Sequence, residues 1–253
     1  MHKTAIIGNN VILGDNVEIG PYSVIEEGVE IGDGCWFGNH VNIRKGTRIG
    51  ANCCVYHGAV IGQNPQDITF KGGDTHVELG ESVTIGEFVT ISRGTESRGK
   101  TVIGNHSYLM TYVHVGHDCT LGEHVILTNC VQISGHVIID DWVNIGGMTP
   151  VHQFCRIGKH AFIGGGFRVV KDVPPYILAA GEPLKFSGIN MVGLRRSGFS
   201  PAMRKMIKNV YRLIYQSPLN TTQAIEEIKN KLPRSNEVEE IISFVEASER
   251  GII

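Results

Sequence analysis

The sequence predicts a mainly β fold: a parallel β-helix of hexapeptide repeats with a small C-terminal α-helical domain. One supporting observation is an aliphatic residue that recurs every six positions through the first two thirds of the chain. Another is the change to a helical period near residue 200. The third is the composition, which combines 32 glycines in 253 residues with only 7% aromatic residues. This composition suits a core of small aliphatic side chains with many tight corners.

The six-residue repeat runs from Ile7 to Val169. Of the 28 positions in this frame, only Asp67, Gly73 and Ser97 lack a large apolar side chain. Each repeat supplies one short strand and one corner, and three repeats close a coil of 18 residues that pairs with the next coil through parallel backbone hydrogen bonds. A helix is excluded here, because a period of six places apolar residues on no single face of a helix with 3.6 residues per turn.

Two segments interrupt the repeat and are predicted to protrude as loops. They cover about residues 63–78 and 92–100, and the first combines polar residues with Pro and Gly. Loops on a rigid scaffold often carry functional residues. We therefore expect the β-helix and its two loops over residues 1–175, and a connector with the helical domain over residues 176–253.

Three helices are predicted in the C-terminal domain. The first begins after Ser200, an N-cap residue followed by a proline, and carries apolar residues at helical spacing over residues 203–214. The others cover about residues 222–232 and 236–248. Helices this short depend on packing against a larger body, which the β-helix supplies.

Charge and hydropathy exclude several classes of partner. The formal net charge is −2, so nothing in the bulk charge predicts a nucleic-acid partner or an anionic membrane surface. No apolar run approaches the roughly 20 residues of a membrane span, so no membrane insertion is expected. The N-terminus lacks an apolar signal segment, which predicts a cytoplasmic protein.

The cysteines are predicted to be packing residues, with a disulfide or metal role as the alternative. No CxxC pair is present among the six. Four of them occupy the small inward position of the repeat, where cysteine behaves as a small apolar residue. These four are Cys35, Cys53, Cys119 and Cys155.

Candidate catalytic residues gather at one corner of the predicted coil. His117 and Asp118 follow the inward Val115 and are expected at outward corner positions. Because one coil has 18 residues, Gly135 lies one coil above His117 and His136 one coil above Asp118. A neutral imidazole beside a carboxylate can take a proton from a hydroxyl, with the carboxylate fixing the tautomer. Gly135 could present its backbone N–H to a developing oxyanion.

Other histidines need a separate interpretation. Gln153 lies two coils above His117, with His152 directly before it, and His114 lies at the end of the preceding repeat. No serine or cysteine here pairs as a nucleophile, so direct transfer to a bound hydroxyl is favoured over a covalent intermediate. Elsewhere, His106, His124 and His160 share a column with Trp142 that is expected to be an exposed surface without catalytic chemistry.

Zinc is an alternative for the histidine cluster. Zinc takes three or four N, S or O ligands at about 2.0–2.3 Å, and the histidines of the cluster are numerous enough. The His-x4-His spacing that zinc-dependent β-helix hydratases of the γ-carbonic anhydrase type require is absent. We therefore expect no metal.

Several motifs together carry a family resemblance: NPQD (64–67), HVGHDC (114–119), SGH (134–136), GGMTPVHQFCRIG (146–158), DVPPY (172–176) and INMVGLRRSGFS (189–200). On these motifs and over essentially its whole length, the chain resembles the acyl-ACP–UDP-N-acetylglucosamine O-acyltransferases of lipid A biosynthesis. The resemblance implies a left-handed β-helix and a homotrimer with active sites in the clefts between subunits. It also implies transfer of an R-3-hydroxyacyl chain from acyl carrier protein to the 3-OH of the UDP-sugar, with no cofactor beyond the acyl-ACP co-substrate.

The resemblance also assigns roles to individual residues. It implies that His117 is the catalytic base, Asp118 its partner and Gly135 the oxyanion donor. It implies substrate contacts for His114, His136, His152 and Gln153, a sugar contact for Asp67, nucleotide contacts for Asn190 and Arg196, and a ruler for the acyl chain at Gly165.

Two positions depart from the family pattern. Thr69 stands where many members have lysine, and Val192 stands where some have glutamate. A 3-amino sugar nucleotide is therefore an alternative acceptor, and a non-catalytic β-helical scaffold is the alternative outside enzymes. A basic cluster on the helical domain, Arg195, Arg196, Lys205 and Lys208, is predicted to receive the acidic carrier protein, with a solvated helix face as the alternative.

Overall fold

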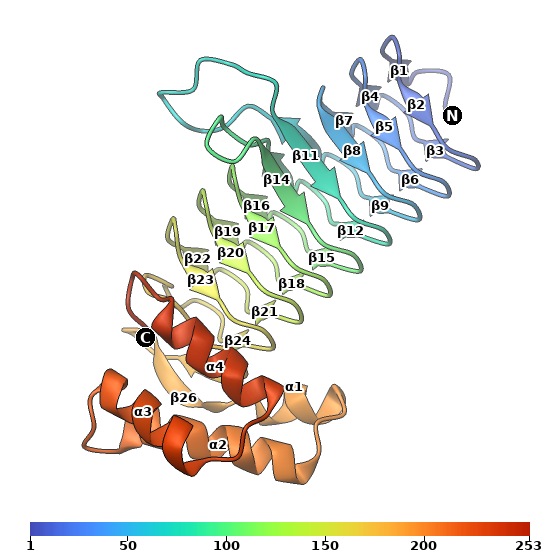
Figure 1. Cartoon of the computed structure of the whole chain (residues 1–253). Coiled ribbons are helices and arrows are strands. Elements are labelled where there is room, and N and C mark those ends of the chain that lie inside the picture. Colours follow the sequence, from blue (N-terminus) through green and yellow to red (C-terminus); the bar gives the residue numbers. More distant parts are fainter.

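Three parallel sheets form the faces of a long triangular prism, and a group of helices closes one end of it (Figure 1). The structure is a computed structural model that describes all 253 residues. The N-terminus lies at the end of the prism farthest from the helices. This architecture confirms the predicted parallel β-helix with a C-terminal helical domain.

The three sheets are called A, B and C, and their strands follow one another in rotation along the chain. Sheet A contains β1 (Ile6–Ile7), β4 (Val24–Ile25), β7 (Asn42–Ile43), β10 (Val60–Gln63), β13 (Thr90–Ser92), β16 (His114–Val115), β19 (Gln132–Ile133) and β22 (Pro150–Val151). Sheet B contains β2 (Ile12–Leu13), β5 (Glu30–Ile31), β8 (Thr47–Ile49), β11 (His76–Leu79), β14 (Lys100–Ile103), β17 (Thr120–Leu121), β20 (Ile138–Ile139) and β23 (Arg156–Ile157). Sheet C contains β3 (Glu18–Ile19), β6 (Trp36–Phe37), β9 (Cys54–Val55), β12 (Thr84–Ile85), β15 (Tyr108–Leu109), β18 (Ile126–Leu127), β21 (Asn144–Ile145), β24 (Phe162–Ile163), β25 (Ile177–Ala180) and β26 (Lys185–Ile189).

The strand register follows the 18-residue coil and shows where the loops enter. Ile7 pairs with Ile25, and Val115 pairs with Ile133. Ile61 instead pairs with Ile91, because the first loop lengthens its coil. The loops occupy residues 64–75 and 93–99, slightly inside the predicted limits.

The repeat's aliphatic side chains form one continuous core inside the prism. Most of these residues are fully buried, as are the four inward cysteines Cys35, Cys53, Cys119 and Cys155. None of the six cysteines forms a disulfide. The prediction that the four inward cysteines are packing residues is confirmed.

Sheet C extends past residue 175, where a connector was expected to begin. β25 pairs in parallel with β24, and β26 pairs antiparallel with β25, so sheet C continues to residue 189. The expected connector is therefore the last part of the sheet, and it covers an edge that would otherwise expose unpaired backbone groups.

Four helices follow: α1 (Met191–Arg196), α2 (Pro201–Gln216), α3 (Thr221–Lys231) and α4 (Asn236–Glu246). The last three match the predicted helices within two residues, and the side chain of Ser200 caps α2 as expected. Helix α1 was not predicted, because six residues are too few to show a helical period. None of the helices has the length and apolarity of a transmembrane span.

Candidate active site

His117 and Asp118 form a hydrogen-bonded dyad at the A–B edge, the corner where β16 of sheet A turns into β17 of sheet B. His117 Nδ1 lies 2.8 Å from Asp118 Oδ2. Gly135 lies directly above the imidazole: a Cβ on Gly135 would fall 2.6 Å from His117 Nε2. The stacking that the 18-residue coil predicted is confirmed.

The second loop covers Asp118, which corrects the expectation that both dyad residues lie outward. Asp118 has a φ of 58°, a left-handed conformation that aspartate tolerates, and the residue is 0% exposed. Its Oδ1 accepts hydrogen bonds from the backbone N–H groups of Thr95, at 3.0 Å, and Arg98, at 3.2 Å. Its Oδ2 accepts one from the Thr95 hydroxyl at 2.7 Å.

These contacts keep Asp118 ionised. Burial alone would raise the pKa of the carboxyl, but the hydrogen bonds from His117 and Thr95 outweigh it and leave the pKa below its ordinary value. An ionised carboxylate only accepts hydrogen bonds, so His117 carries its proton on Nδ1. The lone pair of Nε2 therefore faces the open side of the site.

The space beside Nε2 is a small polar cavity of about 320 Å³. Its walls include His114, His117, Gly135 and Gln153, together with Gln66 from the first loop. The N–H of Gly135 donates no hydrogen bond within the chain, so it is free for a ligand. A base and a free N–H donor therefore share one cavity.

Two further histidines surround the dyad and tend to be neutral. Burial lowers the pKa of His114, and its Nδ1 lies 2.8 Å from the Thr90 hydroxyl. Burial also lowers the pKa of His136, although the charge of Asp118 opposes this shift. The His136 ring lies edge-on to His117, with centroids 5.0 Å apart.

The first loop and the coil above complete the predicted cluster. Asp67 Oδ1 accepts hydrogen bonds from the N–H and hydroxyl of Thr69, which lower the pKa of Asp67; the histidines at 117 and 136 add to this shift. His152 Nδ1 lies 3.1 Å from the carbonyl oxygen of Gln153. The structure thus brings Asp67, His114, His136 and Gln153 close to the dyad, whereas His152 adjoins Gln153 but does not line the cavity.

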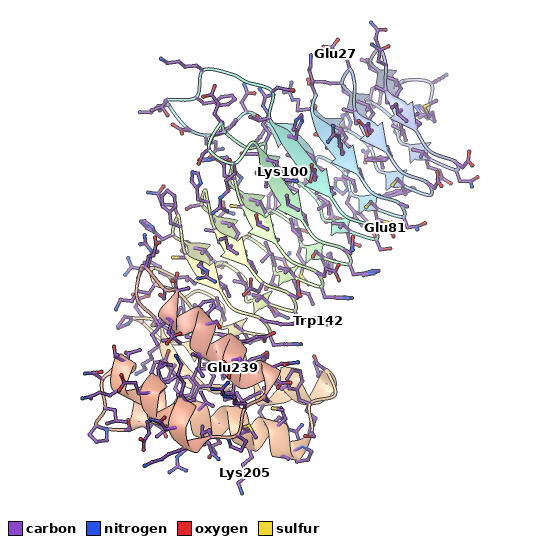
Figure 2. The ribbon with its side chains drawn as sticks, viewed as in Figure 1. Glu27, Glu81, Lys100, Trp142, Lys205 and Glu239 are labelled. Carbon is purple, nitrogen blue, oxygen red and sulfur yellow. The ribbon has the colours of Figure 1, made fainter.

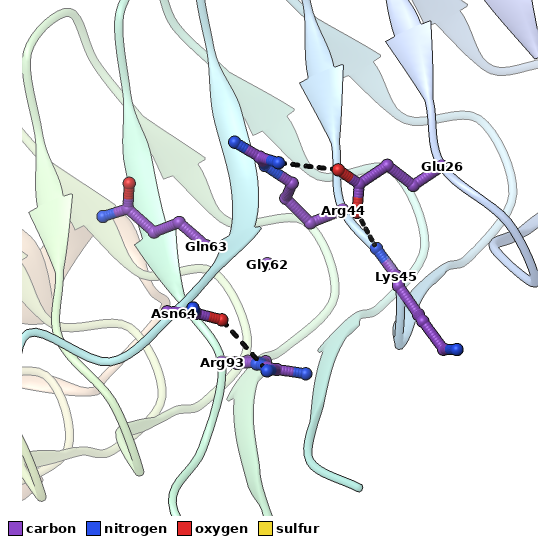
Figure 3. A pocket seen from close by; sticks show the side chains of 7 residues that line it. All are labelled: Glu26, Arg44, Lys45, Gly62, Gln63, Asn64 and Arg93. Atoms are coloured by element: carbon purple, nitrogen blue, oxygen red, sulfur yellow. Dashed lines mark hydrogen bonds and ion pairs between the residues drawn. The ribbon is translucent and has the colours of Figure 1, made fainter. Parts of the chain in front are cut away.

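A wholly polar cavity of about 510 Å³ lies at the base of the two loops (Figure 3). Glu26 forms an ion pair with Arg44 at 2.7 Å, and Lys45 forms one with Glu27, also at 2.7 Å. Arg93 donates to Asn64 Oδ1 at 2.9 Å. All three cations are engaged by the chain, and the contact of Arg93 fastens the first loop to the start of the second.

Asn190 and Arg196 lie elsewhere, in a cavity of about 740 Å³ against sheet C and the B–C edge. The side chain of Asn190 caps α1 through Gly193 N–H and donates to the carbonyl oxygen of His160 at 2.9 Å. Val192 also lines this cavity. The structure therefore separates these two predicted site residues from the dyad.

The histidine column expected to be a plain exposed surface forms one wall of this second cavity. The rings of His106, His124, Trp142 and His160 stack in sequence, and Trp142 projects from the prism (Figure 2). His160 is only 7% exposed, because Phe199 packs against it. Burial lowers its pKa to about 4. The expectation of exposure is wrong for His160.

Gly165 lies at the third edge, where sheet C turns into sheet A. A Cβ there would fall 2.9 Å from the carbonyl oxygen of Gly147, so two backbones approach closely. Successive edges lie up to about 20 Å apart, because six residues at about 3.3 Å each separate them. The predicted site residues are therefore spread over three edges of one chain.

His117, Asp118 and His136 are close enough to hold a metal ion, since their ligand atoms lie within 4.8 Å of one another. These three residues were predicted to share one corner, but only the histidines were considered as zinc ligands. Thr95 and Arg98, the loop residues that hold Asp118, were not predicted. The signal available for them was the position of the second loop, which interrupts the coil immediately before the one that carries His117.

Comparisons with known proteins agree along the whole chain. The family model of domain 2 of UDP-N-acetylglucosamine O-acyltransferase matches residues 172–253, and the bacterial transferase hexapeptide model matches residues 28–63 and 100–135. Curated acyl-[acyl-carrier-protein]–UDP-N-acetylglucosamine O-acyltransferases are similar: the protein from Aquifex aeolicus is 52% identical over 100% of this chain and 97% of its own, and that from a Sulfurihydrogenibium species is 51% identical over 100% and 93%.

Solved structures agree equally well. A UDP-N-acetylglucosamine acyltransferase from Bacteroides fragilis superimposes with a TM-score of 0.99 at 45% identity, covering 100% of this chain and 99% of its own. The Acinetobacter baumannii structure gives a TM-score of 0.96 at 40% identity, covering 100% and 98%. The predicted fold class, a left-handed parallel β-helix of hexapeptide repeats with a helical domain, is confirmed.

Proposed function

The chain belongs to the family of acyl-[acyl-carrier-protein]–UDP-N-acetylglucosamine O-acyltransferases, and from this premise we propose that it transfers an R-3-hydroxyacyl chain from acyl carrier protein to the 3-OH of UDP-N-acetylglucosamine, the first step of lipid A biosynthesis. The observation that carries the proposal is the dyad, with His117 Nε2 facing a cavity that also contains the free N–H of Gly135. Acyl carrier protein delivers the acyl group as a co-substrate, and the reaction uses no other cofactor.

The transfer proceeds in two proton movements. His117 Nε2 takes the proton from the sugar hydroxyl while the sugar oxygen attacks the thioester carbonyl carbon. The carbonyl oxygen becomes an oxyanion, which the N–H of Gly135 stabilises. Collapse of this intermediate breaks the C–S bond, and the departing thiolate of the carrier protein takes the proton from His117 Nε2. Asp118 stabilises the imidazolium between the two movements.

A covalent acyl-enzyme is not needed, and neither of the serines that line the cavity, Ser92 and Ser134, forms a hydrogen bond with His117. Cys119 is the cysteine closest in sequence to the dyad, but it is fully buried and its Sγ donates to the carbonyl oxygen of Ser134. Burial raises the pKa of its thiol to about 12. A thiol of this kind stays protonated near neutral pH and is a poor nucleophile.

The separation of the predicted site residues supports a homotrimer. The dyad on the A–B edge and Arg196 in the cavity against sheet C line separate cavities of the same chain. Two chains that place these edges together would join the polar cavity of one subunit to the larger cavity of its neighbour. The predicted substrate residues would then line one cleft between subunits.

The helical domain offers a surface for the carrier protein. Arg195, Arg196, Lys205 and Lys208 are exposed and form no ion pair within the chain. Lys205 points away from the helical domain into solvent (Figure 2). An acidic carrier protein would be attracted to unpaired cations at this position, next to the cavity that contains Arg196.

A 3-amino sugar nucleotide is the second candidate acceptor. Two departures from the family pattern favour it. The hydroxyl of Thr69 donates a hydrogen bond to Asp67, and Val192 places an apolar side chain in the cavity that contains Asn190 and Arg196. Offering the 3-hydroxy and 3-amino nucleotides in parallel decides between them. We expect the 3-hydroxy nucleotide to react with the higher kcat/KM.

His117→Ala tests the proposed function directly. We expect kcat to fall by roughly 10²–10⁴-fold, the usual contribution of a positioned general base, with the thermal midpoint unchanged. His57→Ala is the matched control, because His57 is an exposed corner histidine that forms no hydrogen bond with a carboxylate. Near-normal turnover in the His117 variant would contradict the assignment of the base.

A further inference from the structure

Thr95, in the second loop, holds the carboxylate of the dyad at both oxygens. Its backbone N–H donates to Asp118 Oδ1 at 3.0 Å, and its hydroxyl donates to Oδ2 at 2.7 Å. The same Oδ2 accepts the Nδ1–H of His117 at 2.8 Å. Thr95 therefore helps to hold Asp118 in the orientation in which it accepts the Nδ1–H of His117.

The direction of the hydroxyl hydrogen bond is set within the loop. The backbone N–H of Ser97 lies 3.2 Å from Thr95 Oγ1 and donates to it. The hydroxyl thus accepts from the loop and gives its own proton to Asp118. The resulting chain runs from Ser97 N–H through the Thr95 hydroxyl to Oδ2, and hydrogen bonds in such a chain polarise one another.

Nothing else in the protein replaces this contact. The donors to the Asp118 carboxylate are Thr95, the backbone N–H of Arg98 and His117, and the carboxylate is closed to water. His136 Nε2 lies 3.7 Å from Oδ2, too far for a good hydrogen bond. Without the Thr95 hydroxyl, the only side chain that donates to Oδ2 is His117 itself.

We propose that Thr95 is a positioning residue of the acyl transfer: its hydroxyl fixes the carboxylate of Asp118 so that His117 presents Nε2 to the sugar hydroxyl. The inference rests on the proposed function and adds the second loop to the catalytic apparatus. It assigns no contact between Thr95 and either substrate, so the effect of Thr95 belongs to kcat and not to substrate binding.

Thr95→Val removes the hydroxyl and keeps the branched shape. We expect kcat to fall about 10–100-fold, in line with the loss of a hydrogen bond to a charged group, with KM for both substrates unchanged. Thr95→Ser keeps the hydroxyl and should restore kcat. Thr111→Val is the matched control: its hydroxyl donates to the Glu87 carboxylate at 2.8 Å, away from the dyad, and should leave kcat unchanged.

A double-mutant cycle separates positioning from a loss of fold. If Thr95 acts through Asp118, the variant T95V/D118N is no slower than D118N alone, whereas independent roles would multiply the two losses. The Nδ1 proton of His117 gives a second measurement: its low-field NMR resonance should persist in wild type and Thr95→Ser, and broaden or move in Thr95→Val.

Several results would overturn the inference. They are a kcat within about twofold of wild type for Thr95→Val, multiplicative losses in the cycle, or an unchanged Nδ1 resonance. A wild-type protein that transfers no acyl chain would contradict the proposed function instead. The resonance would still report whether Thr95 positions the dyad.

Discussion

Replacing Asp118 by asparagine should reverse the tautomer of His117. The two backbone N–H groups of Thr95 and Arg98 point at Oδ1, so the amide of an asparagine must place its oxygen there. Its NH2 group then occupies the position of Oδ2 and faces the Thr95 hydroxyl and His117 Nδ1. The hydroxyl can rotate to accept a hydrogen bond, but Nδ1 can accept one only if the proton moves to Nε2.

A His117 protonated on Nε2 cannot take the proton of the sugar hydroxyl. We therefore expect Asp118→Asn to lower kcat by roughly 10²–10⁴-fold, about 3–5 kcal/mol of transition-state stabilisation. The structure should survive, because the strongest backbone contacts at Oδ1 are kept and the altered hydrogen bonds cost only about 1–2 kcal/mol.

The measurement is steady-state transfer from R-3-hydroxyacyl carrier protein to UDP-N-acetylglucosamine, with thermal unfolding of each variant. Asp140→Asn is the control, since Asp140 is a partly buried carboxyl about one coil farther along the chain, in a different cavity and not part of the dyad. A kcat for Asp118→Asn within about threefold of wild type would refute the tautomer argument.

Three further predictions follow from other parts of the structure. Gly135→Ala should lower kcat strongly while leaving the thermal midpoint nearly unchanged, because the new methyl group would lie 2.6 Å from His117 Nε2. Normal turnover in this variant would contradict the tight stacking of Gly135 on the imidazole. Dialysis against EDTA should leave turnover unchanged and elemental analysis should find no stoichiometric zinc; a loss restored by zinc would instead place a metal on His117, Asp118 and His136. Arg196→Glu should raise KM for acyl carrier protein and weaken its salt dependence, whereas Lys3→Glu at the far end of the prism should change neither.

The sequence alone was sufficient for the repeat and the stacking of the dyad. Parallel pairing between coils tolerates no slip that would turn the aliphatic side chains out of the core, so counting by 18 placed Gly135 over His117 correctly. The same count located both loops. Helical period and capping were strong enough to locate α2, α3 and α4.

Only the tertiary structure decided what covers each corner. The loops leave the repeat, so no count could place Thr95 on Asp118, and a carboxylate expected in solvent is fully enclosed. Likewise, α1 and Phe199 come from sequence far beyond the repeat, and they bury His160 in a cavity wall. The physical reason is that backbone pairing between coils is periodic and local, whereas the covering of an edge depends on segments whose path the period does not control.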